Sequence, residues 1–248
     1  MPDGKLIILA GPSCVGKSPL EKALARLHPD LRKSLRPVVL YNDRAPRPGE
    51  VDGVDYRFRD RDSIQALEQE EDFVIMEVRG DLQALDVGEL KQDLEAGDVF
   101  FEGNPYIGER LLTDAALNGV SRLGVFMAPL SRAEILYLRD TAGDAALAGL
   151  VLDVMRRKLL RRTRKQKSEL SLQDLENIET RAGSAYRELK MAHAFDAVLP
   201  NHDGEDSDNW DAFYYPLGDA WRSLRAFAAL LRNEPSDFTE RWEEGLVP

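Results

Sequence analysis

The chain has 248 residues, 43% of them hydrophobic, and a formal net charge of −11 at pH 7. Its length suits one large domain or one core with inserted subdomains, and its apolar fraction can fill a substantial core. The acidic balance opposes general binding to nucleic acid or to an anionic membrane, because Lys and Arg supply most of the affinity for such polyanions.

Composition also restricts the expected location of the protein and the metal sites that it can form. No apolar run is long enough to span a membrane and no secretory signal pattern is present, so the expected location is the cytoplasm. Cys14 is the one cysteine, which excludes an intramolecular disulfide framework and a multi-cysteine metal site. The histidines His28, His193 and His202 lack ligand spacing, and we expect no zinc site.

The first predicted elements are a buried strand over residues 6–10 and an amphipathic helix over residues 18–27. Between them runs Gly-Pro-Ser-Cys-Val-Gly-Lys-Ser, which has the pattern of a phosphate-binding P-loop in its proper strand–loop–helix context. Backbone N–H groups and the helix dipole favour phosphate at such a turn. We therefore expect a nucleotide to bind Gly11, Pro12, Ser13, Cys14, Val15, Gly16, Lys17 and Ser18, with Lys17 on the outer phosphates and the Ser18 hydroxyl on Mg²⁺.

The elements that follow alternate between strands and helices. Apolar runs predict strands at residues 38–41, 73–78, 99–101, 123–128 and 197–199, and helical periodicity predicts helices at 62–70, 87–95 and 220–231. Residues 42–55 are a polar, proline-rich loop, 131–192 a long helical excursion, and 203–209 a solvated acidic loop. This order predicts an α/β fold, a P-loop three-layer architecture with a parallel sheet flanked by helices.

The loop after the second predicted strand carries two arginines three positions apart, Arg44 and Arg47. In a loop made rigid by prolines, their guanidinium groups can both bind one phosphate, and Tyr56 can add a hydroxyl donor. Such a set suits a monophosphate acceptor. A second basic cluster, residues 156–167 of the helical excursion, has eight Lys and Arg among twelve residues of an acidic protein.

Three segments resemble the guanylate kinase family: the P-loop, the loop Arg-Ala-Pro-Arg-Pro-Gly-Glu-Val-Asp-Gly-Val-Asp-Tyr-Arg-Phe at residues 44–58, and residues 178–201. The resemblance touches most of residues 5–201 and is patchy between these motifs. It implies a phosphotransferase that uses ATP and Mg²⁺ and phosphorylates a small-molecule monophosphate, GMP above all. In the family a helical lid delivers arginines onto the phosphates; Arg161, Arg162 or Arg164, with Arg181, match it here.

The resemblance implies a role for each matching residue. It gives the catalytic residues as Lys17, Arg44, Arg164 and Arg181, the acceptor-binding residues as Arg44, Arg47, Glu50, Tyr56, Glu77 and Glu102, the metal ligands as Ser18 and Glu102, and Asn201 as a further nucleotide contact. It also implies three parts. Residues 1–35, 96–135 and 193–248 form the P-loop core with a C-terminal extension, 36–95 the acceptor-binding subdomain, and 136–192 the lid.

The chain departs from the family pattern at the acceptor base. Leu40-Tyr41-Asn42-Asp43 replaces the usual hydroxyl side chains, the turn after the short strand lacks its tyrosine, and Glu102-Gly103-Asn104 replaces Asp-x-Asp. Two alternatives therefore stay open: a kinase of another phosphorylated small molecule, or a catalytically weak module that binds a protein partner through residues 140–152 or the C-terminal extension. Retention of Lys17 and Ser18 argues against the second alternative.

Overall fold

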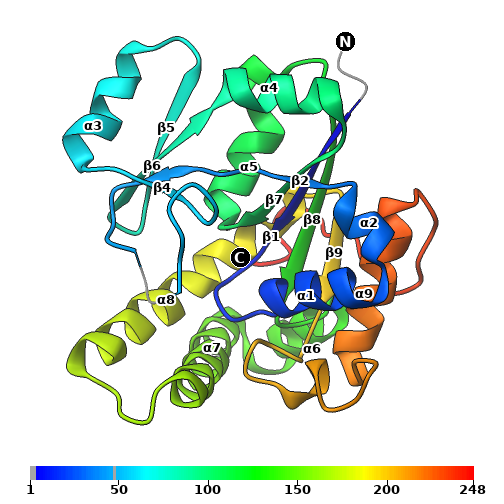
Figure 1. Cartoon of the computed structure of the whole chain (residues 1–248). Helices are drawn as coiled ribbons and strands as arrows, with labels where there is room; N and C mark the ends of the chain where they lie inside the picture. Colours follow the sequence, from blue (N-terminus) through cyan, green and yellow to red (C-terminus); the bar gives the residue numbers. More distant parts are fainter. Residues whose placement is uncertain (1–3, 47–48) are drawn as a thin grey trace. The chain divides into compact units, whose positions relative to one another are not determined.

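The computed structural model describes residues 4–46 and 49–248 and divides into two compact units (Figure 1). Unit 1 comprises Met1–Ile7, Leu35–Phe101 and Thr113–Arg122, and unit 2 comprises Ile8–Ser34, Glu102–Leu112 and Leu123–Pro248. In chain order the elements are β1 (Lys5–Ala10), α1 (Lys17–Leu27), α2 (Pro29–Lys33), β2 (Arg36–Pro37), β3 (Tyr41–Asn42), β4 (Arg57–Phe58), α3 (Arg61–Ala66), η1 (Leu67–Gln69), β5 (Phe73–Val78), β6 (Asp81–Asp86), α4 (Val87–Ala96), β7 (Val99–Gly103), α5 (Pro105–Thr113), η2 (Ala115–Leu117), β8 (Ser121–Ala128), α6 (Arg132–Ala142), α7 (Asp144–Gln166), α8 (Leu172–Lys190), η3 (Met191–Ala194), β9 (Ala197–Pro200), η4 (Asp208–Trp210) and α9 (Gly218–Leu231).

A mostly parallel sheet carries the P-loop and has the strand order β2-β7-β1-β8-β9. Strands β2 and β7 pair in parallel, as do β8 and β9. The side chains of β1 from Leu6 to Ala10 are buried, as expected for a strand covered on both faces. The predicted α/β fold and the predicted strands at β1, β7, β8 and β9 are confirmed.

In unit 1 a second, four-stranded sheet has the order β4-β3-β6-β5. Helix α3 covers one face of it, where Ile64 packs with Leu82 and Ala84. Strand β4 is tied to α4 by Arg57, whose two Nη atoms donate to the Glu89 carboxylate at 2.6 Å each. This small sheet positions the loop that the sequence assigns to the acceptor.

In unit 2, helix α5 lies close to the parallel sheet because glycines remove the intervening side chains. A Cβ on Gly108 would be 3.0 Å from the Cβ of Ala10, and one on Gly124 would be 2.8 Å from Leu112. Helix α9 packs beside α1 and β9. The apolar face predicted for α9 is confirmed, since Leu224 and Phe227 are fully buried.

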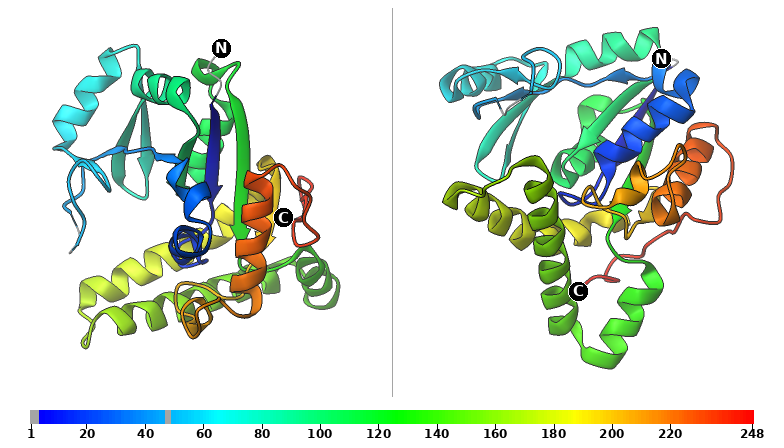
Figure 2. Two further views of the ribbon diagram at one scale, coloured as in Figure 1. Left: turned by 45° about the vertical axis from the view of Figure 1, so that its right-hand side comes forward. Right: turned by 60° about the horizontal axis from the view of Figure 1, so that its bottom comes forward.

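Helices α6, α7 and α8 form the predicted helical excursion (Figure 2). Helices α7 and α8 run side by side, and α7 buries a stripe of residues four positions apart, from Leu147 through Met155 to Thr163. Arg156 of α7 makes a two-pronged ion pair with Glu179 of α8, at 2.7 and 2.8 Å. In the described ranges, no helix is long and apolar enough to cross a membrane.

Two sequence expectations are wrong in detail. The single strand expected over residues 38–41 is divided, because the chain leaves the edge of the parallel sheet after Val38, whose N–H still donates to Phe100, and joins the other sheet at Tyr41. The acidic loop expected to be solvated is instead docked, with Asp206 only 8% exposed.

Candidate active site

The P-loop turn requires glycine at both ends. Gly11 has a φ of 152° and Gly16 a φ of 113°, a backbone region that residues with a Cβ rarely adopt. A Cβ on Gly11 would be 2.4 Å from the Met127 carbonyl oxygen, and one on Gly16 would be 2.5 Å from the Asn201 amide nitrogen. The turn thus fits closely against the ends of β8 and β9, and it opens into the N-terminus of α1 at Lys17.

Lys17 is buried within this turn, and its Nζ donates to the carbonyl oxygens of Gly11 at 2.9 Å and Pro12 at 3.0 Å. Asn201, directly after β9, supports the same turn, because its amide donates to the Val15 carbonyl at 2.8 Å. The Asn201 side chain is fully buried, so here it braces the P-loop. Burial raises the pKa of the Cys14 thiol to about 12, which makes this cysteine a poor nucleophile.

Glu102 lies near the end of β7 and faces the start of α1. Its Oε2 lies 3.5 Å from the Ser18 hydroxyl. Burial raises the pKa of Glu102 to about 7, Lys17 opposes the rise, and the nearby Glu205 and Glu21 add to it. Oxygen ligands at adjacent positions around Mg²⁺ lie about 3 Å apart, so Ser18 and Glu102 have the chemistry and spacing of a magnesium pair.

The acceptor loop in unit 1 is built around Arg44. Its two Nη atoms donate to the Glu50 carboxylate at 2.7 and 2.6 Å, and its guanidinium lies 5.1 Å from the Tyr56 ring centroid and 5.4 Å from that of Phe58. Hydrogen bonding to Glu50 outweighs the opposing effect of burial and raises the pKa of Arg44. The structure therefore brings Arg44, Glu50 and Tyr56 together, whereas Arg47 lies outside the described residues.

Two buried amides face each other beside this loop. Asn42 of β3 pairs in register with Gln83 of β6, so the two side chains share one face of the small sheet. The Asn42 Oδ1 accepts the Arg44 N–H at 3.1 Å, and Asn42 Nδ2, a buried donor, has no hydrogen-bond partner among the described residues. Within the same described ranges, the Gln83 Oε1, a buried acceptor, has no hydrogen-bond partner either.

Glu77, which the resemblance places near the base, lies on the face of the small sheet opposite to that of Asn42 and Gln83. It pairs in register with Leu82 and is thus on the opposite face from Gln83. Its Oε2 is 3.6 Å from an Nη atom of Arg61 in α3, and its side chain is 63% exposed. Asn42 and Gln83 lie on the other face, which Asp81 of β6 shares.

The basic cluster on α7 meets the acidic loop of residues 203–208. Arg162 Nη1 donates to Glu205 at 2.9 Å, and both side chains are largely buried. Arg161 lies 3.7 Å from Asp206 and remains exposed, and Arg164 is exposed as well. Arg181, on α8, is half-buried.

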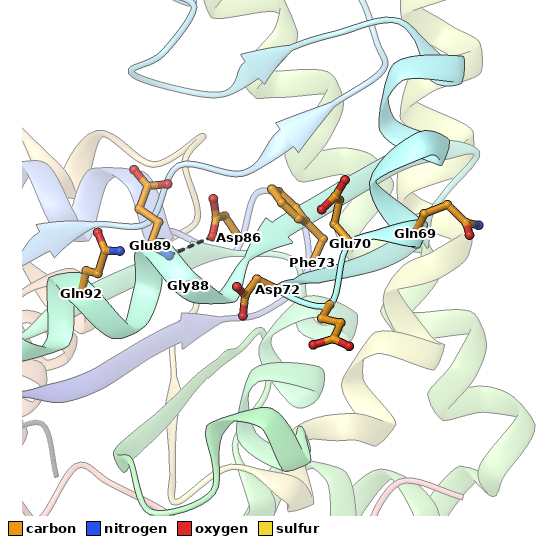
Figure 3. Close-up of a pocket in the computed structure, with 9 residues that line it drawn as sticks. Gln69, Glu70, Asp72, Phe73, Asp86, Gly88, Glu89 and Gln92 are labelled. Atoms are coloured by element: carbon orange, nitrogen blue, oxygen red, sulfur yellow. Dashed lines mark hydrogen bonds between the residues drawn. The ribbon is translucent and has the colours of Figure 1, made fainter.

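A separate groove in unit 1, of about 570 Å³, lies where β5, β6 and α4 begin or end (Figure 3). Acidic side chains dominate it, and the Asp86 carboxylate is used to accept the Glu89 N–H at 2.8 Å. Carboxylates repel phosphate, so this groove does not suit a nucleotide's phosphates. Across the described part of the chain, no group of three or more His, Cys, Asp or Glu side chains is arranged to hold a metal ion.

Comparisons with known proteins agree with this geometry. The family model for guanylate kinase matches residues 3–95. A guanylate kinase of Rhodococcus jostii is 32% identical over 203 residues, which is 81% of this chain and 81% of that protein. The chain belongs to the guanylate kinase family. A guanylate kinase of Cereibacter sphaeroides is 37% identical over 145 residues, 57% of this chain and 66% of its own.

The fold of the family is also found among solved structures. The crystal structure of guanylate kinase from Anaplasma phagocytophilum matches with a TM-score of 0.56 and 16% identity, over 94% of this chain and 87% of that one. At this identity the likeness concerns the fold. The family implies that the chain uses ATP and acts on a small molecule.

Sequence analysis did not identify two residues of interest, Gln83 and Glu205. Gln83 was missed because β6 was not predicted: its alternation of Leu82, Gln83 and Ala84 is short and weakly polar. Glu205 was missed because an acidic stretch between predicted elements is normally solvated. Glu205 could have been found only by pairing the acidic loop with the basic face of α7. Local sequence patterns do not reveal such a contact, because the loop follows about forty residues later in the chain.

Proposed function

We propose that the chain transfers the γ-phosphoryl group of ATP to GMP, giving ADP and GDP. The observation that carries this proposal is a complete P-loop between β1 and α1 in a chain whose guanylate kinase relative aligns over 81% of its length. An oxygen of the GMP phosphate forms the new bond to the γ-phosphorus as the bond to the β-phosphate oxygen breaks. ATP and GMP are cytoplasmic metabolites, and we place the reaction in the cytoplasm.

On the donor side, the backbone N–H groups of residues 11–18 cradle the phosphates of ATP. Lys17 exchanges its two carbonyl partners for outer phosphate oxygens, which places a positive charge where negative charge develops. Ser18 and Glu102 would hold Mg²⁺, which neutralises phosphate charge when bound. Arg162 or Arg164, with Arg181, supply further positive charge from the helical excursion, which serves as a lid.

On the acceptor side, Arg44 binds the GMP phosphate with Arg47 and Tyr56. Glu50 supports this step by fixing the plane of the Arg44 guanidinium through two hydrogen bonds. Asn42 and Gln83 present a buried donor and a buried acceptor without partners. Guanine offers the complementary pair on one edge, the O6 acceptor and the N1–H donor, and we assign base reading to these two amides in place of Glu77.

The two open alternatives are less favoured. A binding module has no chemical need for a buried Lys17 or for Ser18 facing Glu102. A kinase of another phosphorylated small molecule has no need for a matched pair of amides beside the phosphate-binding arginine. Protein partners at residues 140–152 or at the C-terminal extension remain a prediction, and Phe213, Tyr214 and Tyr215 are exposed there.

A panel of acceptors tests the proposal. GMP, dGMP, IMP, AMP and a sugar phosphate are each supplied with Mg-ATP, and ADP release is measured. We expect kcat/KM for GMP to exceed that for AMP by about 1,000-fold or more, because an acceptor that leaves buried amides unpaired is strongly rejected. Equal rates with all acceptors, or ADP release that needs no acceptor, would contradict the proposal.

A further inference from the structure

The acidic loop of residues 203–208 backs the P-loop. The Glu205 N–H donates to the Cys14 carbonyl oxygen at 3.3 Å, and a Cβ on Gly204 would lie 2.3 Å from the same oxygen. The loop therefore contacts the middle of the P-loop turn at Cys14.

The Glu205 side chain reaches from this position to Arg162 of α7. Its carboxylate accepts from Arg162 Nη1 at 2.9 Å, with 17% of the Glu205 side chain and 18% of the Arg162 side chain exposed. The Arg162 Nε is buried and has no hydrogen-bond partner among residues 4–46 and 49–248. Alongside the dominant effect of burial, Glu205 raises and Arg162 lowers the pKa of Cys14, which places both charges near the middle of the P-loop.

The other acidic residues of the loop contact the same face of α7 as Glu205 does. Lys158 lies 3.6 Å from Asp206, and Lys165 lies 2.5 Å from Asp208. These residues share one helix face with Arg162. Arg164 follows Arg162 by two positions, which is a rotation of about 200° around the helix, and it is exposed.

We propose that Glu205 is a positioning residue for phosphoryl transfer, which holds the Arg162 guanidinium beside the P-loop so that Arg162, rather than Arg164, meets the phosphates of the donor. The inference rests on the proposed function. Glu205 binds one Nη atom of Arg162 and so holds the guanidinium near the middle of the P-loop. A fixed guanidinium costs no reorganisation when charge develops in the transition state.

The test compares Glu205→Gln with Asp208→Asn in the full chain. Both variants remove one negative charge from the same loop, but the Asp208 side chain is 85% exposed and contacts Lys165 rather than Arg162. We expect Glu205→Gln to lower kcat for GMP phosphorylation by about tenfold, with KM for GMP changed by less than about twofold. Asp208→Asn should stay within about twofold of wild type, and Glu205→Asp, which keeps the carboxylate, should recover part of the loss.

A double-mutant cycle isolates the effect that passes through Arg162. Arg162→Ala should lower kcat by about 100-fold and Arg164→Ala by a clearly smaller factor. Glu205→Gln should have no further effect in the Arg162→Ala background. A purely structural role for Glu205 would lower the thermal midpoint without this non-additivity in kcat.

The results that would overturn the inference are distinct from failure of the proposed function. If folded wild-type protein transfers no phosphoryl group to GMP, the proposed function itself is wrong. If wild type is active and Glu205→Gln is equally active, Glu205 does not act through Arg162. The same conclusion follows if the fold loss in kcat of the double variant equals the product of the losses of Glu205→Gln and Arg162→Ala. If Glu205→Gln binds ATP more tightly by calorimetry with kcat unchanged, the carboxylate competes with phosphate and the inference fails.

Discussion

In our proposal, Asn42 and Gln83 carry specificity for the base although neither belongs to a matching motif. Both amides are buried, and each keeps a polar atom with no hydrogen-bond partner in the described part of the chain. An unpaired buried donor or acceptor costs about 1–3 kcal/mol in the folded chain. A ligand that satisfies both atoms removes this cost on binding, so the pair favours an acceptor with adjacent hydrogen-bonding groups.

Substitution of Gln83 by Leu tests this account at the residue scale. We expect kcat/KM for GMP to fall by about 10- to 100-fold, because the base loses one buried partner. The free energy of unfolding should stay the same or rise, since an unpaired acceptor is removed. Gln65→Leu, on the exposed surface of α3, is the control and should leave kcat/KM unchanged. Unchanged GMP kinetics in Gln83→Leu would rule out base reading by this residue.

Among the elements, the turn from β1 to α1 is the one whose backbone geometry most restricts which residues can occupy it. Gly16 has a positive φ, and an added Cβ would be 2.9 Å from the Asp203 carbonyl oxygen in addition to its contact with Asn201. We therefore expect Gly16→Ala to lower the free energy of unfolding by about 2 kcal/mol or more and to abolish ATP binding.

Gly149 of α7 is the matched control for that change. No atom lies within 4 Å of its added Cβ, and it sits within a regular helix. Gly149→Ala should therefore stabilise the chain by about 0.5–1 kcal/mol, measured by urea unfolding, and leave ATP binding intact. Equal effects of the two substitutions would show that the P-loop turn is not specially constrained.

His202 joins α6 to α9 in a pH-dependent way. Its Nδ1 lies 2.6 Å from Asp219 and its Nε2 lies 2.9 Å from Glu134, so only the doubly protonated ring donates to both carboxylates. Burial alone would lower the pKa of His202, but the two carboxylates outweigh it and raise the pKa above 6.5. Arg222, 3.3 Å from Asp219, is the neighbouring cation.

Because the folded-state pKa of His202 is raised, its contribution to stability is complete below pH 6.5 and is lost as pH rises through the folded-state value. We expect His202→Gln to destabilise the chain at about pH 6 and to have little effect at about pH 9. Urea unfolding of both proteins across this range measures the difference. A difference that is constant with pH would contradict the proposed pairing.

The sequence was a good guide to some elements and a poor one to others, for physical reasons. Buried strands such as β1 and β8 are continuous apolar runs, and capped amphipathic helices such as α4 have a clear period, so these were predicted. Strand β6 was not, because its pairing with β3 and β5 is a tertiary contact. The P-loop and Arg44 were found from local motifs, whereas Gln83 and the Glu205–Arg162 pair depend on residues far apart in the chain.

At the scale of the whole molecule, the net charge of −11 conflicts with binding two anionic nucleotides unless positive charge is local. Each unit carries basic side chains at its proposed site: Lys17 and Arg162 belong to unit 2, and Arg44 belongs to unit 1. In our proposal the donor residues and the acceptor residues thus lie in different units. Substitutions in one unit should therefore alter affinity for one substrate at a time.

The most direct test of the account follows the transferred group itself. Wild-type protein and Lys17→Met are incubated with Mg²⁺, GMP and ATP labelled in its γ-phosphate. We predict that wild type moves the label into GDP in an amount equal to the ADP formed, and that Lys17→Met does so at a rate at least about 100-fold lower. Label released as inorganic phosphate, or GDP formed equally well by Lys17→Met, would contradict the account.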